Sequence, residues 1–294
     1  MIVVTAPTSN IGSRVLAHLL ESDDLVRVIV RDPTRLAPTT LARVEIFQGS
    51  HSDRGVLDRA FDGADTVFWL VPPNPRAESV IAAYVDFTRP AAELFRAKGV
   101  QRVVGVTALG RDTPQASHAG LVTGSLAMDD LISESGVAYR AVTNPSFMDN
   151  LLRQAQPIKT QGVFFGPIAG DRRMPICAVR DIAAVTTRWL RDPSWSGVDR
   201  VAVHGPEDLS FNDMAGIMSA ALGKTVRYQQ IPFDAYTAGF IERGMSPAMA
   251  RGMTDMAVAK DAGLDNYEVR TLESTTPTTF RQWCEDELKP AVLA

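Results

Sequence analysis

Short apolar runs rich in β-branched residues alternate along the first half of the chain with stretches that repeat apolar side chains every three or four positions. Runs of the first kind are typical of strands covered on both faces of a parallel sheet, and the stretches between them are typical of amphipathic helices. The six expected strands are residues 2–5, 26–30, 44–47, 66–71, 102–107 and 138–142. The alternation therefore predicts an α/β fold with a doubly wound parallel sheet.

The stretches between these strands carry clear helix signals. Ile11, Val15 and Leu19 would line one face of a helix that begins directly after the first strand. A helix at about 89–98 is expected to end at Gly99, because glycine closes helices without backbone strain. Six strands in this alternation make a Rossmann sheet the leading architecture.

The pattern loosens after Asn144-Pro145, where prolines and glycines interrupt every long element. We therefore expect a Rossmann core at residues 1–155 and a mixed segment at 156–294. Part of the mixed segment, about 175–205, is expected to return to the sheet as a helix at 179–190 and a strand at 200–203. The rest, a helix at 211–222 and the stretch from 233 onward, is expected to form a smaller C-terminal substrate-binding cap.

A methionine-rich stretch at 233–261 leaves two interpretations open. Its methionines form either an adaptable apolar wall over a substrate pocket or ordinary helix packing, because methionine is a flexible gap filler in both settings. They are Met245, Met249, Met253 and Met256.

Composition narrows the class of protein. The 294 residues are 45% hydrophobic and 22% charged, without an apolar run long enough to cross a bilayer, and the chain begins as a strand and not as a secretion signal. We therefore expect a cytoplasmic protein with no membrane contact. A net charge of −4 argues against a broad basic surface for nucleic acid. Cys177 and Cys284 lack metal-site spacing, so no metal is expected. The expected partner is a small-molecule substrate. The sequence leaves open whether the chain forms homo-oligomers.

The junction between the first strand and the first helix carries the most specific motif, Thr5-Ala6-Pro7-Thr8-Ser9-Asn10-Ile11-Gly12. In a Rossmann fold this turn offers free N–H groups and the positive end of a helix dipole to a pyrophosphate. NmrA-like proteins, which are atypical short-chain dehydrogenase/reductases, carry Thr-Gly-Ala/Pro-Thr-Gly-x-Ile/Leu-Gly here. The chain resembles this family at Thr5, Pro7, Thr8, Ile11 and Gly12. The resemblance implies a dinucleotide-binding core whose cofactor contacts include Thr5, Thr8, Ser9, Asn10 and Ile11.

Two glycines of that family pattern are missing. Ala6 replaces the glycine of the tight turn, and its Cβ, followed by Pro7, predicts a negative φ and an extended turn. Ser9 replaces the glycine that lets the backbone approach the phosphates, although its hydroxyl could donate to a phosphate oxygen. Gly12 remains and serves close packing of helix on strand. The loop thus predicts the fold more firmly than the ligand, and a degenerate Rossmann shell without cofactor stays an alternative.

The residues after the second strand indicate which cofactor is preferred. Val30-Arg31-Asp32-Pro33 resembles the Val-Arg-Asp/Asn-Pro of NmrA-like proteins, and an Arg here favours the 2′-phosphate of NADP(H). We expect Arg31 and Arg35 to bind that phosphate, with solvation of an exposed loop as the alternative. The family resemblance also places Val71, at the end of the fourth strand, against the dinucleotide.

The catalytic pair of short-chain reductases is absent. Such enzymes use a Ser or Thr after strand five and a Tyr-x-x-x-Lys pair on the next helix, where the Tyr donates the proton. Thr107 occupies the Ser/Thr position and is a candidate both for a catalytic role and for a cofactor contact. The next helix has neither Tyr nor Lys, and no Lys occurs between Lys98 and Lys159. The remaining candidate acid is His118, which titrates near neutrality, unless it is an ordinary loop histidine.

The sixth strand leads into the expected substrate pocket. NmrA-like proteins follow this strand with an Arg-Pro pair and an aromatic residue that lie beside the nicotinamide. Pro145 and Phe147 match that pattern, whereas Asn144 replaces the Arg. Phe147, Phe164 and Phe165 are expected to form apolar walls for a flat substrate, with core packing as the alternative for the last two.

Three functions remain open. The leading one is an NADPH-dependent reductase of a small conjugated or aromatic, quinone-like compound, which needs no protein acid when the product takes its protons from water. The second is a non-catalytic regulatory protein that senses NADP(H). The third is a cofactor-independent isomerase, cyclase or lyase on a degenerate Rossmann scaffold.

Overall fold

A seven-stranded, wholly parallel sheet forms the centre of the computed structural model, which describes all 294 residues. In spatial order its strands are β10 (Val198–Ala202), β6 (Ala138–Asn144), β5 (Arg102–Ala108), β4 (Thr66–Trp69), β1 (Ile2–Thr5), β2 (Val26–Val30) and β3 (Val44–Gln48). This order is that of a doubly wound Rossmann sheet, so the predicted fold class is confirmed. The strand order reverses between β1 and β4, and ligands of such sheets bind outside the carboxyl ends of the strands at that point.

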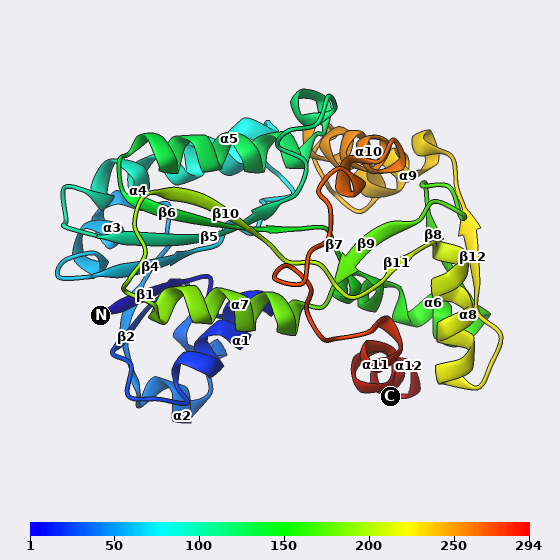
Figure 1. Cartoon of the computed structure of the whole chain (residues 1–294), viewed down its shortest axis with the longest axis horizontal. Coiled ribbons are helices and arrows are strands. Elements are labelled where there is room, and N and C mark those ends of the chain that lie inside the picture. The colour runs from blue at the N-terminus through cyan, green and yellow to red at the C-terminus, as the bar shows by residue number, and fades with distance from the viewer.

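Helices cover both faces of the sheet (Figure 1). One face carries α1 (Asn10–Leu19) and α7 (Val179–Arg191). The other carries α3 (Arg54–Ala60), α4 (Phe87–Phe95) and α5 (Leu121–Glu134). A π-helical turn at Ala82–Asp86 precedes α4, so this helical segment begins earlier and ends earlier than the 89–98 expected from sequence. The short α2 (Pro38–Leu41) joins β2 to β3.

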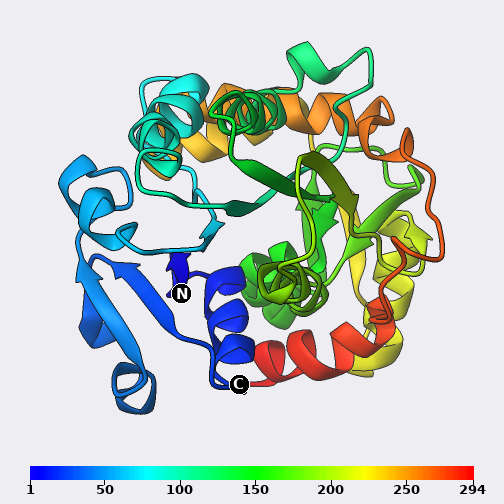
Figure 2. The same ribbon diagram turned by 60° about the vertical axis from the view of Figure 1, so that its left-hand side comes forward.

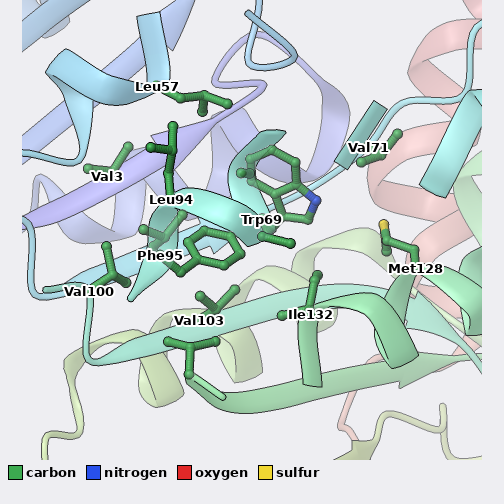
Figure 3. Packing of buried hydrophobic residues seen from close by; sticks show 14 of the residues in the cluster. Val3, Leu57, Trp69, Val71, Leu94, Phe95, Val100, Val103, Met128 and Ile132 are labelled. Atoms are coloured by element: carbon green, nitrogen blue, oxygen red, sulfur yellow. The ribbon is translucent and has the colours of Figure 1, made fainter. Parts of the chain in front are cut away.

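The larger core cluster lies between the sheet and the helices α3, α4 and α5. Figure 3 shows Trp69 of β4 facing Phe95 of α4, with Val103, Met128 and Ile132 closing the space beneath them. The Trp69 indole N–H donates to the Thr88 hydroxyl at 3.1 Å, so the polar end of this buried ring is satisfied. Burial of such large side chains supplies most of the stability that holds the carboxyl ends of the strands in place.

The rest of the chain builds a second lobe beyond the carboxyl edge of the sheet (Figure 1). Two small sheets belong to it, one of β7 (Ser146–Phe147), β9 (Met174–Cys177) and β11 (Asp208–Leu209), the other of β8 (Val163–Gly166) and β12 (Arg227–Gln230). Its helices are α6 (Ala155–Gln161), α8 (Phe211–Leu222), α9 (Phe233–Glu242), α10 (Pro247–Asp261), α11 (Phe280–Trp283) and α12 (Lys289–Leu293). The C-terminal helices run back beside α1 (Figure 2), where Arg14 pairs with Glu287 at 2.9 Å. None of the helices combines the length and apolar character needed to span a bilayer.

Helix α10 packs tightly on α5. The backbones approach so closely that a Cβ on Gly120 would overlap the Gly252 carbonyl, and Gly120 itself has φ +55°. Met249 is 2% exposed within the core cluster of the α5 face, whereas the neighbouring methionines of this segment stay half-buried. Ordinary helix packing therefore explains Met249. Farther along α10, Lys260 pairs with Asp265 in the turn Leu264–Asn266, and both side chains are buried.

Candidate functional site

The loop between β1 and α1, residues 6–9, adopts an unusual backbone conformation. Ala6 has φ +48° and is the only non-glycine residue in the chain with a positive φ. The expectation that a Cβ and the following Pro7 would hold this turn at negative φ is wrong. A left-handed conformation costs an L-residue roughly 1–2 kcal/mol, so neighbouring interactions must hold Ala6 there.

Those interactions come from Ser9 and Gly12. The backbone N–H and the hydroxyl of Ser9 both donate to the Ala6 carbonyl, at 3.0 and 2.8 Å. The Ser9 Oγ in turn accepts the Gly12 N–H at 3.0 Å and caps α1. Gly12 leaves room for the Ala6 carbonyl oxygen, which a Cβ at this position would overlap. The Ser9 hydroxyl is thus used inside the loop, where its hydrogen goes to the Ala6 carbonyl oxygen.

Two backbone donors of the loop remain available. The N–H groups of Asn10 and Ile11, in the first turn of α1, have no acceptor in the protein. The half-buried Thr8 hydroxyl next to them makes no hydrogen bond either. The side chains of Asn10 and Ile11 serve other ends. The Asn10 amide donates to Asp149 at 3.3 Å, whose other oxygen accepts the Val179 N–H of α7 at 3.0 Å, and the Ile11 side chain is buried.

Thr5 was expected to contact the cofactor, and the structure gives its hydroxyl a different task. The side chain is fully buried, and Oγ1 donates to the Phe68 carbonyl at 2.9 Å while accepting the Leu70 N–H at 3.0 Å. Both bonds join β1 to the end of β4 at the point where the strand order reverses. Thr5 therefore holds the two central strands together and has no donor left for a phosphate.

Replacing Ala6 by glycine should stabilise the fold. We expect Ala6→Gly to raise the free energy of unfolding by about 0.5–1 kcal/mol, because relief of left-handed strain exceeds the entropy that glycine gains in the unfolded chain. Urea denaturation measures the change. Ala184, exposed on α7, is the matched control, since Ala184→Gly should destabilise by about 0.5–1 kcal/mol. Equal losses in both variants would show that Ala6 is unstrained.

Arg31 and Arg35 stand at the far end of the same edge. Both side chains are exposed, and neither pairs with an acidic residue. The Asp32 between them accepts hydrogen bonds from the Thr34 hydroxyl and N–H, at 2.6 and 3.1 Å, which lower the pKa of its carboxyl. Because Asp32 caps its own turn, both guanidinium groups are free to meet an external anion.

His51 anchors the loop after β3 to the loop after β4. Burial lowers the pKa of its imidazole to about 4, so the ring is neutral and Nε2 donates to the Leu70 carbonyl at 3.0 Å. Trp69 and Phe87 meet the ring edge to face, with centroids 5.3 and 4.8 Å away. The buried Val71 follows directly on this strand end. These contacts of His51 hold the backbone next to Val71 in place.

A buried polar network lies where the catalytic pair of a short-chain reductase would be. The Thr107 hydroxyl donates to Asp129 at 2.8 Å and lies 2.7 Å from the Ser125 hydroxyl. Tyr139 of β6 donates to the other Asp129 oxygen at 2.6 Å. Burial raises the pKa of the Asp129 carboxyl to about 6, against the hydrogen bonds of Tyr139 and Thr107, which lower it. The partly exposed Arg111 lies 3.6 Å from Asp129.

Room for this network depends on Gly105 of β5. A Cβ there would overlap the Tyr139 hydroxyl. At the strand ends, the buried Asn144 donates to the carbonyls of Thr107 and Val142, at 3.1 and 2.7 Å, and thereby ties β6 to β5 just ahead of the buried Pro145. Sequence reasoning missed Tyr139 and gave Asp129 no role. A Ser and an Asp four positions apart on one helix face were the available signal.

The two remaining groups of predicted residues have different surroundings. His118 is exposed in a 3-10 turn ahead of α5, and its ring contacts Ser117 at 2.8 Å without joining the Thr107 network. Phe164 is completely buried between Phe211 and Tyr228. It belongs to the core of the second lobe, which corrects its assignment as a pocket wall.

Phe165 and Phe147 keep part of their surface. Phe165 is half-buried, and Gln154 holds its backbone through two hydrogen bonds of 2.8 Å. Phe147 is half-buried on β7, where it pairs with Cys177 at the junction of the two lobes. Of the three predicted aromatic walls, Phe147 lies nearest in sequence to the carboxyl end of β6.

Comparison with known proteins places this geometry in a family. The family model described as NmrA-like matches residues 1–283, which is nearly the whole chain. The chain belongs to the NmrA-like family. The match covers the loop between β1 and α1, Arg31, Thr107 and helix α5.

Relatives of this NmrA-like protein include named reductases. The chain is 28% identical over 96% of both chains to a (4-alkanoyl-5-oxo-2,5-dihydrofuran-3-yl)methyl phosphate reductase of Streptomyces griseus. It is 30% identical to an NAD(P)H azoreductase of Xenophilus azovorans, over 87% of this chain and 86% of the relative. The fold matches that of the NADPH-dependent quinone oxidoreductase of Escherichia coli in complex with NADPH, with a TM-score of 0.79, 22% identity, and coverage of 97% and 98%.

Proposed function

We propose that this NmrA-like protein is an NADPH-dependent reductase of a small conjugated or aromatic compound. The observation that carries the proposal is Ala6, held at φ +48° by Ser9 and Gly12. Strain of this kind persists in proteins chiefly where function requires the conformation. A shell that had lost its cofactor would have no reason to keep it, because a relaxed turn is more stable.

The residues at the carboxyl edge fit a bound dinucleotide phosphate. The free N–H groups of Asn10 and Ile11, with the Thr8 hydroxyl, would hold the pyrophosphate at the positive end of α1. Arg31 and Arg35 would bind the 2′-phosphate. Val71, Pro145 and Thr107 would border the nicotinamide end. When bound, NADPH supplies a hydride to an electron-poor acceptor.

The named relatives support the acceptor class. A dihydrofuran ring with an oxo group, an azo bond and a quinone share an electrophilic conjugated π system. Phe147 is the aromatic side chain we assign to stacking against such a substrate. We favour an enzyme over an NADP(H)-sensing regulator, because the buried Asp129 behind Thr107 suits proton delivery and adds nothing to sensing.

Cofactor preference gives the direct test. We expect Arg31→Ala to weaken NADPH binding about 10- to 100-fold, because a charge-assisted hydrogen bond to phosphate contributes roughly 1.5–3 kcal/mol. Binding of NADH, which lacks that phosphate, should stay unchanged. Fluorescence titration of both nucleotides measures the two affinities. Arg59→Ala, an exposed arginine on α3, is the matched control and should leave both unchanged.

Activity is tested with NADPH and three acceptors, namely 1,4-naphthoquinone, 2-cyclohexenone and an azo dye. Oxidation of NADPH that depends on at least one acceptor is the expected result. Tight binding of NADPH with no oxidation across the three would overturn the enzyme and favour the sensor. Failure to bind NADPH at millimolar concentration would overturn both and leave a cofactor-independent function.

A further inference from the structure

A buried hydrogen-bonded chain runs from the carboxyl edge of the sheet into the space between β5, β6 and α5. Thr107, second from the end of β5, is its outer member, and Asp129 lies behind it with 3% of its surface exposed. Tyr139 and Ser125 complete the chain, at 2.6 Å from Asp129 and 2.7 Å from Thr107. A buried carboxyl costs free energy unless it is fully bonded, and nothing in the proposed binding of cofactor uses this one.

The protonation state of Asp129 decides what Thr107 can offer. When the carboxyl is ionised, the single hydroxyl hydrogen of Thr107 points to Asp129, and only oxygen lone pairs face outward. When the carboxyl is protonated, it donates its own hydrogen to Thr107, and the Thr107 hydrogen is free to turn toward a substrate oxygen. Protonation of Asp129 therefore changes the Thr107 hydroxyl, as seen by a substrate, from a hydrogen-bond acceptor into a hydrogen-bond donor.

We propose that Asp129 is the proton source for the reduction of a conjugated carbonyl substrate and delivers its proton through the Thr107 hydroxyl. The proposal rests on the proposed reductase function and names the substrate class within it. A hydride from NADPH adds to the β-carbon of the substrate and leaves an enolate. The enolate oxygen takes the proton of Thr107, which takes the proton of Asp129. The resulting enol tautomerises to the saturated carbonyl, and solvent reprotonates Asp129.

The charges around Asp129 suit this task. Burial raises the pKa of its carboxyl to about 6, and Asp130 adds to that rise. The hydrogen bonds of Tyr139 and Thr107 and the nearby Arg111 lower the pKa. A general acid works best when its pKa lies near the operating pH. A carboxyl with a pKa of about 6 is half protonated at that pH. Turnover that needs the protonated form falls as pH rises through about 6.

The hydrogen-bonded chain also explains why the reduction of one acceptor would depend on Asp129 and the reduction of another would not. A reduced quinone is stable as an anion and takes its protons from water, so its reduction needs no protein acid. An enolate is far more basic and must be protonated as the hydride arrives. Dependence on Asp129 is therefore expected with 2-cyclohexenone and not with 1,4-naphthoquinone.

The test compares both acceptors in the full-length protein. We expect Asp129→Asn to lower kcat for 2-cyclohexenone about 100-fold, with KM for NADPH unchanged, because general acid catalysis contributes 10²–10⁴-fold. Naphthoquinone reduction should stay near wild type. Thr107→Val should share the enone defect, and Thr107→Ser should retain the activity. Ser133→Ala is the matched control, because the Ser133 hydroxyl donates to the Asp129 backbone carbonyl, at 2.7 Å, and not to its carboxyl.

A second readout does not depend on turnover. In the infrared difference spectrum of wild type minus Asp129→Asn, the C=O band of a protonated carboxyl should disappear between about pH 5 and 7.5. Tyr139→Phe removes a hydrogen bond that lowers the pKa, so the band and the pH limb of enone turnover should both persist to higher pH.

Two results separate this proposal from the one on which it rests. An enone rate and pH profile in Asp129→Asn equal to those of an active wild type would overturn the relay and leave the reductase function standing. A wild type that oxidises NADPH with none of the three acceptors would overturn the reductase function and the relay together. An enone defect without any titrating carboxyl band would assign Asp129 a purely structural role.

Discussion

Gly12→Ala is expected to weaken NADPH binding about 100-fold while the protein stays folded, since displacements of 1 Å in a positioned site cost this much. The added Cβ would overlap the Ala6 carbonyl oxygen. That carbonyl accepts both Ser9 bonds, so the loop has to open to make room. The N–H groups of Asn10 and Ile11 then lose their aim at the pyrophosphate.

Gly216→Ala provides the comparison for this effect. Gly216 is exposed on α8, and no atom lies within 4 Å of the position where its Cβ would be. Alanine there should leave NADPH binding unchanged and add about 0.5–1 kcal/mol of stability. Calorimetric titration measures the affinity, and circular dichroism checks the fold. Wild-type affinity in Gly12→Ala would show that the loop has no part in binding.

Lys260→Met should be the most destabilising single substitution proposed for this chain. Asp265 has 1% of its surface exposed, and Lys260 is its ion-pair partner. Removing one member of a buried pair leaves an uncompensated charge and costs about 3–5 kcal/mol. The free energy of unfolding from urea denaturation measures the loss.

An exposed pair and a double variant test the cause of that loss. Arg54 and Glu93 pair with side chains 61% and 54% exposed, so Arg54→Met should cost at most about 1 kcal/mol. Adding Asp265→Asn to Lys260→Met removes the stranded charge and should restore more than half of the stability. A double variant as unstable as Lys260→Met alone would assign the loss to packing and not to charge.

The parallel sheet was predictable because its central strands are runs rich in β-branched residues, which favour a buried strand. Residues 2–5, 26–30 and 138–142 were predicted within two residues of β1, β2 and β6. Tertiary packing decided the helix at 87–95, where a π-helical turn shifts the start. A π-helical turn holds one residue more than an α-helical turn, and the pattern of apolar positions gave no signal for it.

The chemistry of the site was harder to predict, for identifiable reasons. The sign of φ at Ala6 depends on two hydrogen bonds from Ser9 and on space at Gly12, and no local propensity contains that information. Thr5 fits the family motif but turns its hydroxyl between strands. Burial raises the pKa of the Asp129 carboxyl against the hydrogen bonds of Tyr139 and Thr107, which lower it, and these residues meet only in the fold.

The contact between Gly120 and Gly252 fixes the spacing of two helices through main-chain atoms alone. Main chain meets main chain there, so two backbones set how far α10 stands from α5. Met253 and Met256 pack against the core clusters beside this contact. Substitutions at these methionines can be absorbed by side-chain repacking over evolutionary time, whereas position 120, with its positive φ and its backbone neighbour, is held to glycine.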